Sequence, residues 1–139
     1  MKELIGKTIN KITRPKGIDT LICFETSDGD FVYQTEGDCC STSWFEHFEG
    51  IHNLIGHEIS SVEEIDIGKV FLIGSYGPVD EYGEEHDCLQ LYGIKLTTEL
   101  GNSRIEFRNS SNGYYGGWVE FVGNNLRTDR EVEVITEDY

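Results

Sequence analysis

A short stretch in the first third of the chain gathers the side chains best suited to chemistry. It reads Gly37-Asp38-Cys39-Cys40-Ser41-Thr42-Ser43-Trp44-Phe45 and is followed closely by His47. Cys40 precedes a short helix that we predict over residues 43–50, and a helix dipole lowers the pKa of a thiol at its N-terminus. With His47 as a base and Asp38 to orient it, Cys40 would be an activated nucleophile. No cysteine-hydrolase signature surrounds Cys40 and nearby carboxylates would raise its pKa, so a cysteine-dependent enzyme is an alternative and a non-enzymatic protein is favoured.

Metal binding is a second chemistry to weigh, because Cys39 and Cys40 lie near His47, His52 and His57. Zinc sites usually take two cysteines separated by two to four residues. The side chains of adjacent cysteines diverge, so this spacing does not match. We therefore expect neither a metal site nor a cofactor.

A second loop of small residues resembles the first in its composition and in its ending at a tryptophan. Residues 109–118 read Asn-Ser-Ser-Asn-Gly-Tyr-Tyr-Gly-Gly-Trp. Backbone N–H groups, hydroxyls and aromatic faces of this kind suit a small ligand, so a ligand- or nucleotide-sequestering module is another alternative. The candidate ligand-binding residues are Asp38, Cys40, Ser41, Trp44, Asn112, Tyr114, Tyr115 and Trp118.

The charge of the chain is strongly negative. Its 139 residues include 26 acidic and 11 basic side chains, for a formal net charge of −15. Such a chain repels nucleic acid and anionic membranes and is attracted to basic protein surfaces. We therefore predict a basic host or defence protein as the partner, with no direct contact to nucleic acid or membrane. The expected acidic binding surface consists of Glu63, Glu64, Asp66, Asp80, Glu81, Glu84, Glu85 and Asp87.

The elements that position these residues are mainly β-strands. Alternating apolar and polar residues predict strands over residues 8–14, 20–26, 31–34, 119–122 and 130–136, and an apolar run predicts one over 69–74. Asp28-Gly29 marks a tight hairpin turn. The exception is the helix over residues 43–50, where Ser43 and Glu46 form a capping box and Phe45 and Phe48 share a helical face.

The pattern repeats along a chain whose length suits a single domain, residues 1–139. Residues 54–62 match residues 4–12 in their apolar positions, and residues 94–102 match residues 22–30. We therefore predict an internal duplication, with halves 4–53 and 54–126 and an exposed insertion at 65–88. The fold class is mainly β with one short helix, as an antiparallel sheet, a sandwich or a partly open barrel built from two related halves.

Two motifs carry a resemblance to a known family. The stretch Gly37-Asp38-Cys39-Cys40-Ser41-x-Ser43-Trp44-Phe45 and residues 111–117 resemble a domain of unknown function found in small proteins of bacteriophages and their hosts. The resemblance implies a phage-type accessory protein in the cytosol of a bacterial host, and it carries over no catalytic residue. Several acidic phage proteins block CRISPR defence by imitating DNA, so the resemblance also implies an inhibitor of a nucleic-acid-binding host or defence protein. The absence of an apolar segment at the start of the chain agrees with a cytoplasmic location.

Overall fold

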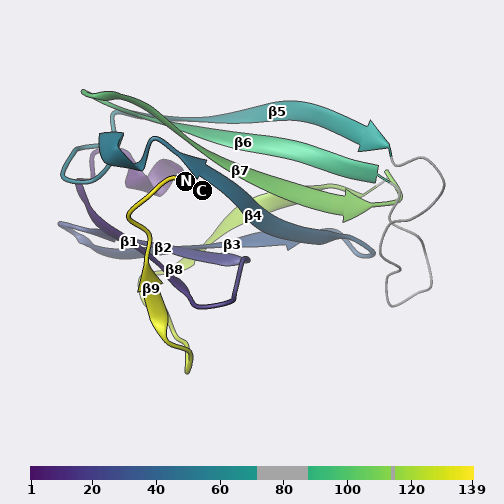
Figure 1. Ribbon diagram of the computed structural model, residues 1–139, viewed down its shortest axis with the longest axis horizontal. Helices are drawn as coiled ribbons and strands as arrows, with labels where there is room; N and C mark the ends of the chain where they lie inside the picture. Colours follow the sequence, from purple (N-terminus) through teal and green to yellow (C-terminus); the bar gives the residue numbers. More distant parts are fainter. Residues whose placement is uncertain (72–87, 114) are drawn as a thin grey trace.

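The computed structural model describes residues 1–71, 88–113 and 115–139, which form two antiparallel β-sheets packed face to face (Figure 1). One sheet has the order β8-β3-β2-β1-β9 and the other the order β4-β7-β6-β5. The five strands of the first sheet are β8 (Gly117–Gly123), β3 (Gly29–Gly37), β2 (Leu21–Thr26), β1 (Ile9–Pro15) and β9 (Val132–Val134). The four strands of the second sheet are β4 (Thr42–Glu49), β7 (Gly101–Ser111), β6 (Cys88–Thr98) and β5 (Ser61–Phe71). The sandwich is thus the predicted alternative that the chain adopts.

Most of the predicted strands are confirmed, and their cause is the alternation of inward and outward side chains. The exception is the strand predicted over 69–74 within an insertion at 65–88, because residues 65–71 are the end of β5 and residues 72–87 lie outside the described residues. In β2 and β3, Phe24 and Tyr33 point into the space between the sheets and are fully buried. Gly29 has a φ of 104°, which closes the hairpin between these strands at the expected place. The core also receives Leu4, the last residue of the 3-10 helix η1 (Lys2–Leu4), and Leu54, which directly follows the 3-10 helix η2 (Ile51–Asn53).

The predicted helix over residues 43–50 is wrong, because this segment is strand β4. Phe45 and Phe48 are both buried, and their spacing of three is typical of a helix. Here a β-bulge between Phe45 and His47 inserts one extra residue, so both rings face the core from an extended strand. Pairing of β4 with β7 satisfies the backbone that a helix would otherwise have satisfied internally.

The two sheets repeat one pairing pattern. Ile12 lies opposite Phe24 in the first sheet, and Val62 lies opposite Leu96 in the second. Strand β4 leaves the first half to pair with β7, and β8 leaves the second half to pair with β3. This exchange is what two related halves would produce, and the duplication itself stays a prediction.

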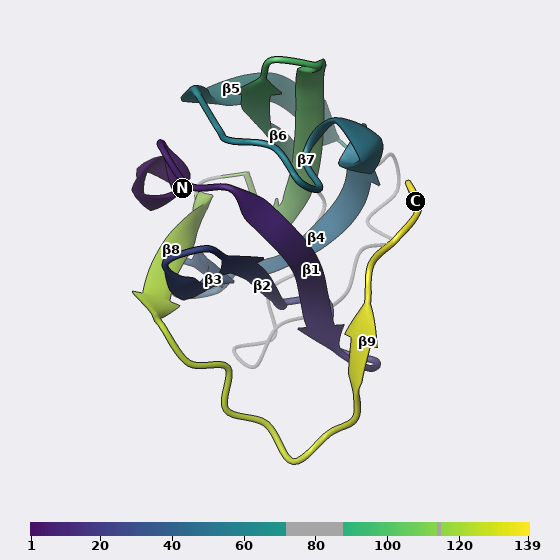
Figure 2. The ribbon, with the colours of Figure 1, turned by 90° about the vertical axis from the view of Figure 1, so that its left-hand side faces the viewer.

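Each long side of the sandwich lies between one edge of the first sheet and one edge of the second, and Figure 2 shows both sides. On one side, the C-terminal segment, residues 132–139, runs between β1 and β4 and adds β9 to the edge of β1. On the other side, β5 and β8 form the edges of the two sheets. No helix within the described residues is long and apolar enough to span a bilayer.

Candidate functional site

The two loops of small residues lie against each other where the chain crosses between the sheets. The backbone N–H of Asp38 donates to the carbonyl of Gly116 at 3.0 Å, and the N–H of Gly116 approaches the Asp38 carboxylate at 3.4 Å. Ser41 folds back on the first loop and donates its hydroxyl to the carbonyl of Asp38 at 2.8 Å. The structure therefore brings the two loops together through contacts with each other, and Asp38 is the candidate residue that makes these contacts.

A buried polar network lies beneath the loops. The Asn109 side chain donates to the Gln90 side chain at 2.7 Å and to the carbonyl of Tyr115 at 2.9 Å, and it accepts from Ser43 at 2.7 Å. The Ser111 hydroxyl also donates to the carbonyl of Tyr115, at 3.0 Å. Because each of these buried groups has a partner, the network fastens the two crossovers to each other. The loops thus use their polar groups within the protein, which weakens the small-ligand hypothesis.

Close approach of the two sheets explains why the loops are rich in glycine. Gly37 and Gly117 pair across β3 and β8, directly against Ser43 and Asn109 of the other sheet. A β-carbon at Gly117 would lie 2.3 Å from the Ser43 hydroxyl and 2.9 Å from Asn109. Only glycine fits at such a contact, so these positions have a packing role.

The two candidate tryptophans do not share a pocket. Trp44 is on the outer face of β4, opposite Arg108, and its indole N–H donates to Glu46 at 2.5 Å. Trp118 is on the outer face of β8, opposite Glu36, with 44% of its surface exposed. Asn112 is exposed, and Tyr114 lies outside the described residues.

The cysteine pair lies in the turn between β3 and β4. Cys40 has a φ of 71°, and its Sγ is 3.0 Å from the Sγ of the exposed Cys39. Because β4 replaces the expected helix, Cys40 has no helix dipole beside it, and the nucleophile alternative loses that argument. Among the described residues, no group of three or more histidine, cysteine, aspartate or glutamate side chains could hold a metal ion.

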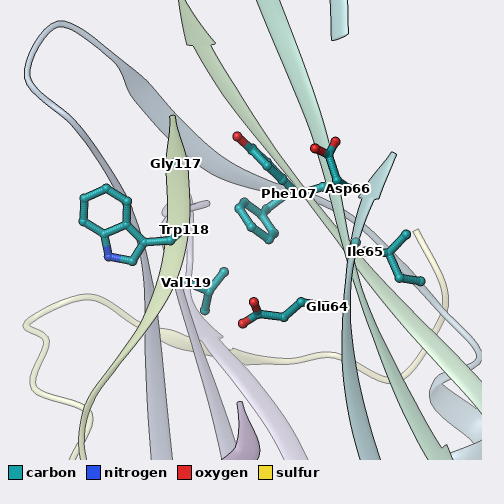
Figure 3. Close-up of a pocket in the computed structure, with 9 residues that line it drawn as sticks. Glu64, Ile65, Asp66, Phe107, Gly117, Trp118 and Val119 are labelled. Atoms are coloured by element: carbon teal, nitrogen blue, oxygen red, sulfur yellow. The ribbon is translucent and has the colours of Figure 1, made fainter. Parts of the chain in front are cut away.

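A groove of about 290 Å³ lies in the opening between β5 and β8. Its floor is a stacked pair of rings, Tyr92 and Phe107, whose centroids are 4.8 Å apart. Val119 extends from β8 toward the groove, as Figure 3 shows, and Trp118 also lines the groove, although its indole ring is directed away from Phe107. Burial raises the pKa of Tyr92, and the negative charge of Asp66 raises it further, so the floor of the groove is uncharged at neutral pH.

Two predicted acidic residues lie on the inner face of the edge strand beside this floor. Glu64 is opposite Ile94 and Asp66 is opposite Tyr92, and directly opposed residues share one face of a sheet. Figure 3 shows the Glu64 carboxylate directed toward Val119 across the groove. Neither carboxylate has a hydrogen bond or an ion pair within the part of the chain that the structure describes.

The other predicted acidic residues do not belong to this groove. Glu63 is on the outer face of β5 and pairs with Lys95 at 3.2 Å. Five more lie outside the described residues, and they are Asp80, Glu81, Glu84, Glu85 and Asp87. Tyr92, Phe107 and Val119 were not predicted from the sequence. The signal that could have found this edge is that Val62, Glu64 and Asp66 occupy every second position of one strand, which places two carboxylates on the same face as an apolar residue.

Three comparisons place the chain among known proteins. It is 35% identical over 106 residues to an uncharacterised protein of Acanthamoeba polyphaga mimivirus, covering 71% of this chain and 73% of that relative. No solved structure matches. A viral connection is therefore supported, while the phage origin stays a prediction. A family model described as a domain of unknown function, DUF7448, matches residues 2–121, and the chain belongs to that family.

Proposed function

We propose that this chain is a non-enzymatic binding protein that captures a basic partner protein at the groove between β5 and β8. The observation that supports it best is the position of Glu64 and Asp66, which face an aromatic floor without a basic neighbour in the described residues. A lysine or arginine side chain would supply the missing charge and lay its alkyl stem on the rings of Tyr92 and Phe107.

The charge balance of the surface supports a basic partner. Most of the basic side chains already pair with carboxylates of the same chain. They are Lys7, Lys11, Arg14, Lys16, Lys95, Arg104 and Arg108. The remaining negative charge produces a field that steers basic proteins toward the surface and accelerates their association at low salt.

We further propose that capture of the partner inhibits it. A protein that holds nucleic acid with lysine and arginine presents the charge that this chain lacks. Occupying that surface would exclude nucleic acid, so the partner would be a host or defence protein of this kind. The net charge and the viral relative support this reading.

Binding to immobilised poly-L-lysine tests the proposal, with duplex DNA as the negative control. We expect binding to poly-L-lysine that weakens steeply as salt rises, because exposed charges are screened beyond about 10 Å at 0.1 M salt. The double variant Glu64→Gln/Asp66→Asn should weaken it more than the matched double variant Glu58→Gln/Asp129→Asn, which removes the same charge elsewhere. Equal losses in the two variants, or binding that salt leaves unchanged, would contradict the proposal.

A further inference from the structure

We propose that the groove takes its partner as an added β-strand, a basic extended segment that pairs with β5 and inserts an apolar side chain between the sheets. This inference rests on the proposed function, and it specifies how the partner is held. The template lies in the protein itself, because the opposite side of the same sandwich already holds the C-terminal segment as an added strand.

The C-terminal segment supplies the template. Val134 lies opposite Thr13 in the pairing of β9 with β1, and the N–H of Ile135 donates to the carbonyl of Ile12 at 2.8 Å. Ile135 enters the core and is only 6% exposed. Tyr139 then exchanges two hydrogen bonds of 3.1 Å with Phe48 of β4. A single extended segment therefore bridges the edges of both sheets.

The opening between β5 and β8 has the same construction. β1 and β5 are the corresponding strands, since Ile12 pairs with Phe24 as Val62 pairs with Leu96. β4 and β8 also correspond to each other. Each comes from the other half of the chain and forms an edge of the sheet that it joins. The outer edge of β5 therefore has the same position in its sheet as the edge of β1 that pairs with β9.

The apolar side chains at the two openings differ in burial, as expected if the C-terminal segment fills one opening and the other opening awaits a strand. Under the C-terminal segment, Ile12 and Phe48 are 0% exposed. Their counterparts, Val62 on β5 and Phe121 on β8, lie beside the groove on the strands that line it, and they are apolar but only partly buried. An added strand would cover this apolar surface and satisfy the edge of β5, which is the usual mode of β-strand addition.

Charge decides what kind of strand fits. Arg14, two residues after Ile12, forms an ion pair with Glu133 of the C-terminal segment. The residue two positions after Val62 is Glu64, so the incoming strand should present lysine or arginine there, and Asp66 strengthens this preference. A C-terminal segment from a second copy would instead bring acidic residues to this edge, namely Glu131, Glu133, Glu137 and Asp138. Like charges make that occupant unfavourable.

Synthetic peptides based on residues 131–139 test the inference. The probe keeps Ile135 and its neighbouring valines and replaces the four acidic residues by lysine. Its matched control has the same sequence and charge, with alternate backbone amides N-methylated so that it cannot pair as a strand. In fluorescence anisotropy we expect the control to bind at least about tenfold more weakly. Glu64→Lys should weaken the probe by about tenfold as well, whereas Asp129→Lys should not.

The outcomes separate the inference from the proposed function. Equal binding of the probe and its methylated control would overturn strand addition and leave charge-driven capture intact. No binding of either peptide or of poly-L-lysine would refute both. Tighter binding of the unmodified acidic peptide would identify a second copy as the occupant and overturn the inference. Circular dichroism of Glu64→Lys and of the milder variant Glu64→Gln is the control that tells a loss of peptide binding from unfolding.

Discussion

Ile135→Ala is the perturbation that tests the template strand most sharply. Ile135 is 6% exposed and belongs to the core cluster, although it lies only four residues before Tyr139, in an acidic stretch of the sequence. The change removes three carbon atoms, each worth about 0.8 kcal/mol when buried, and leaves a cavity. Since a terminal segment can relax into part of that cavity, we expect the free energy of unfolding to fall by about 2–3 kcal/mol.

Urea unfolding followed by circular dichroism measures this loss, with Val134→Ala as the matched control. Val134 lies next in the chain but is 46% exposed on the outer face of β9, so its loss should stay within about 0.5 kcal/mol. If Ile135→Ala costs no more than Val134→Ala, the C-terminal segment does not pack between the sheets. The C-terminal segment would then be no template for a strand bound at the opposite groove.

Three further predictions concern the loops, a cluster of one carboxylate and two arginines, and the thiols. Gly117→Ala should lower the free energy of unfolding by about 1–3 kcal/mol, because its β-carbon would lie 2.3 Å from a facing serine hydroxyl. Gly116→Ala is the control, since its β-carbon would make only an ordinary contact at 3.5 Å, and thermal unfolding compares the two variants. Burial opposes ionisation of Glu106, but two neighbouring arginines outweigh it and hold its pKa below the usual value. Its stabilisation is present above the unfolded pKa of about 4.3 and is lost as pH falls through the lower folded pKa, so Glu106→Gln should flatten the acid limb of stability measured by urea unfolding. Burial, with help from a nearby aspartate, raises the pKa of Cys23 to about 11, so iodoacetamide near neutral pH should label the exposed Cys39 first, as read by mass spectrometry.

The strands and hairpins could be predicted from the sequence because their signals are local. Alternation marks β1, β2 and β3, and Asp28-Gly29 specifies the turn between the last two. The fold class follows from the number of such strands. The arrangement of the strands as a sandwich could not be predicted, because it depends on where the chain crosses from one sheet to the other. The small-residue loops at these crossings do not specify which sheet the next strand joins.

The error at residues 43–50 has a physical cause that a single sequence conceals. A β-bulge and a helical turn both place Phe45 and Phe48 on one face, and only pairing with β7 decides between them. The groove was hidden for a similar reason. Its walls come from β5 and β8, which are distant in sequence, and its floor is Tyr92 and Phe107, so only Glu64, Asp66 and Trp118 of its lining could be predicted.

Amide hydrogen exchange followed by NMR, with and without the lysine-substituted peptide, tests the central claim most directly. Strand addition predicts that the outward-facing amides of residues 61–65 on β5 exchange at least about tenfold more slowly at saturating peptide, while amides of β1 are unchanged. Protection that is confined to other surfaces, or the absence of any protection on β5 when the peptide is bound, would contradict the claim.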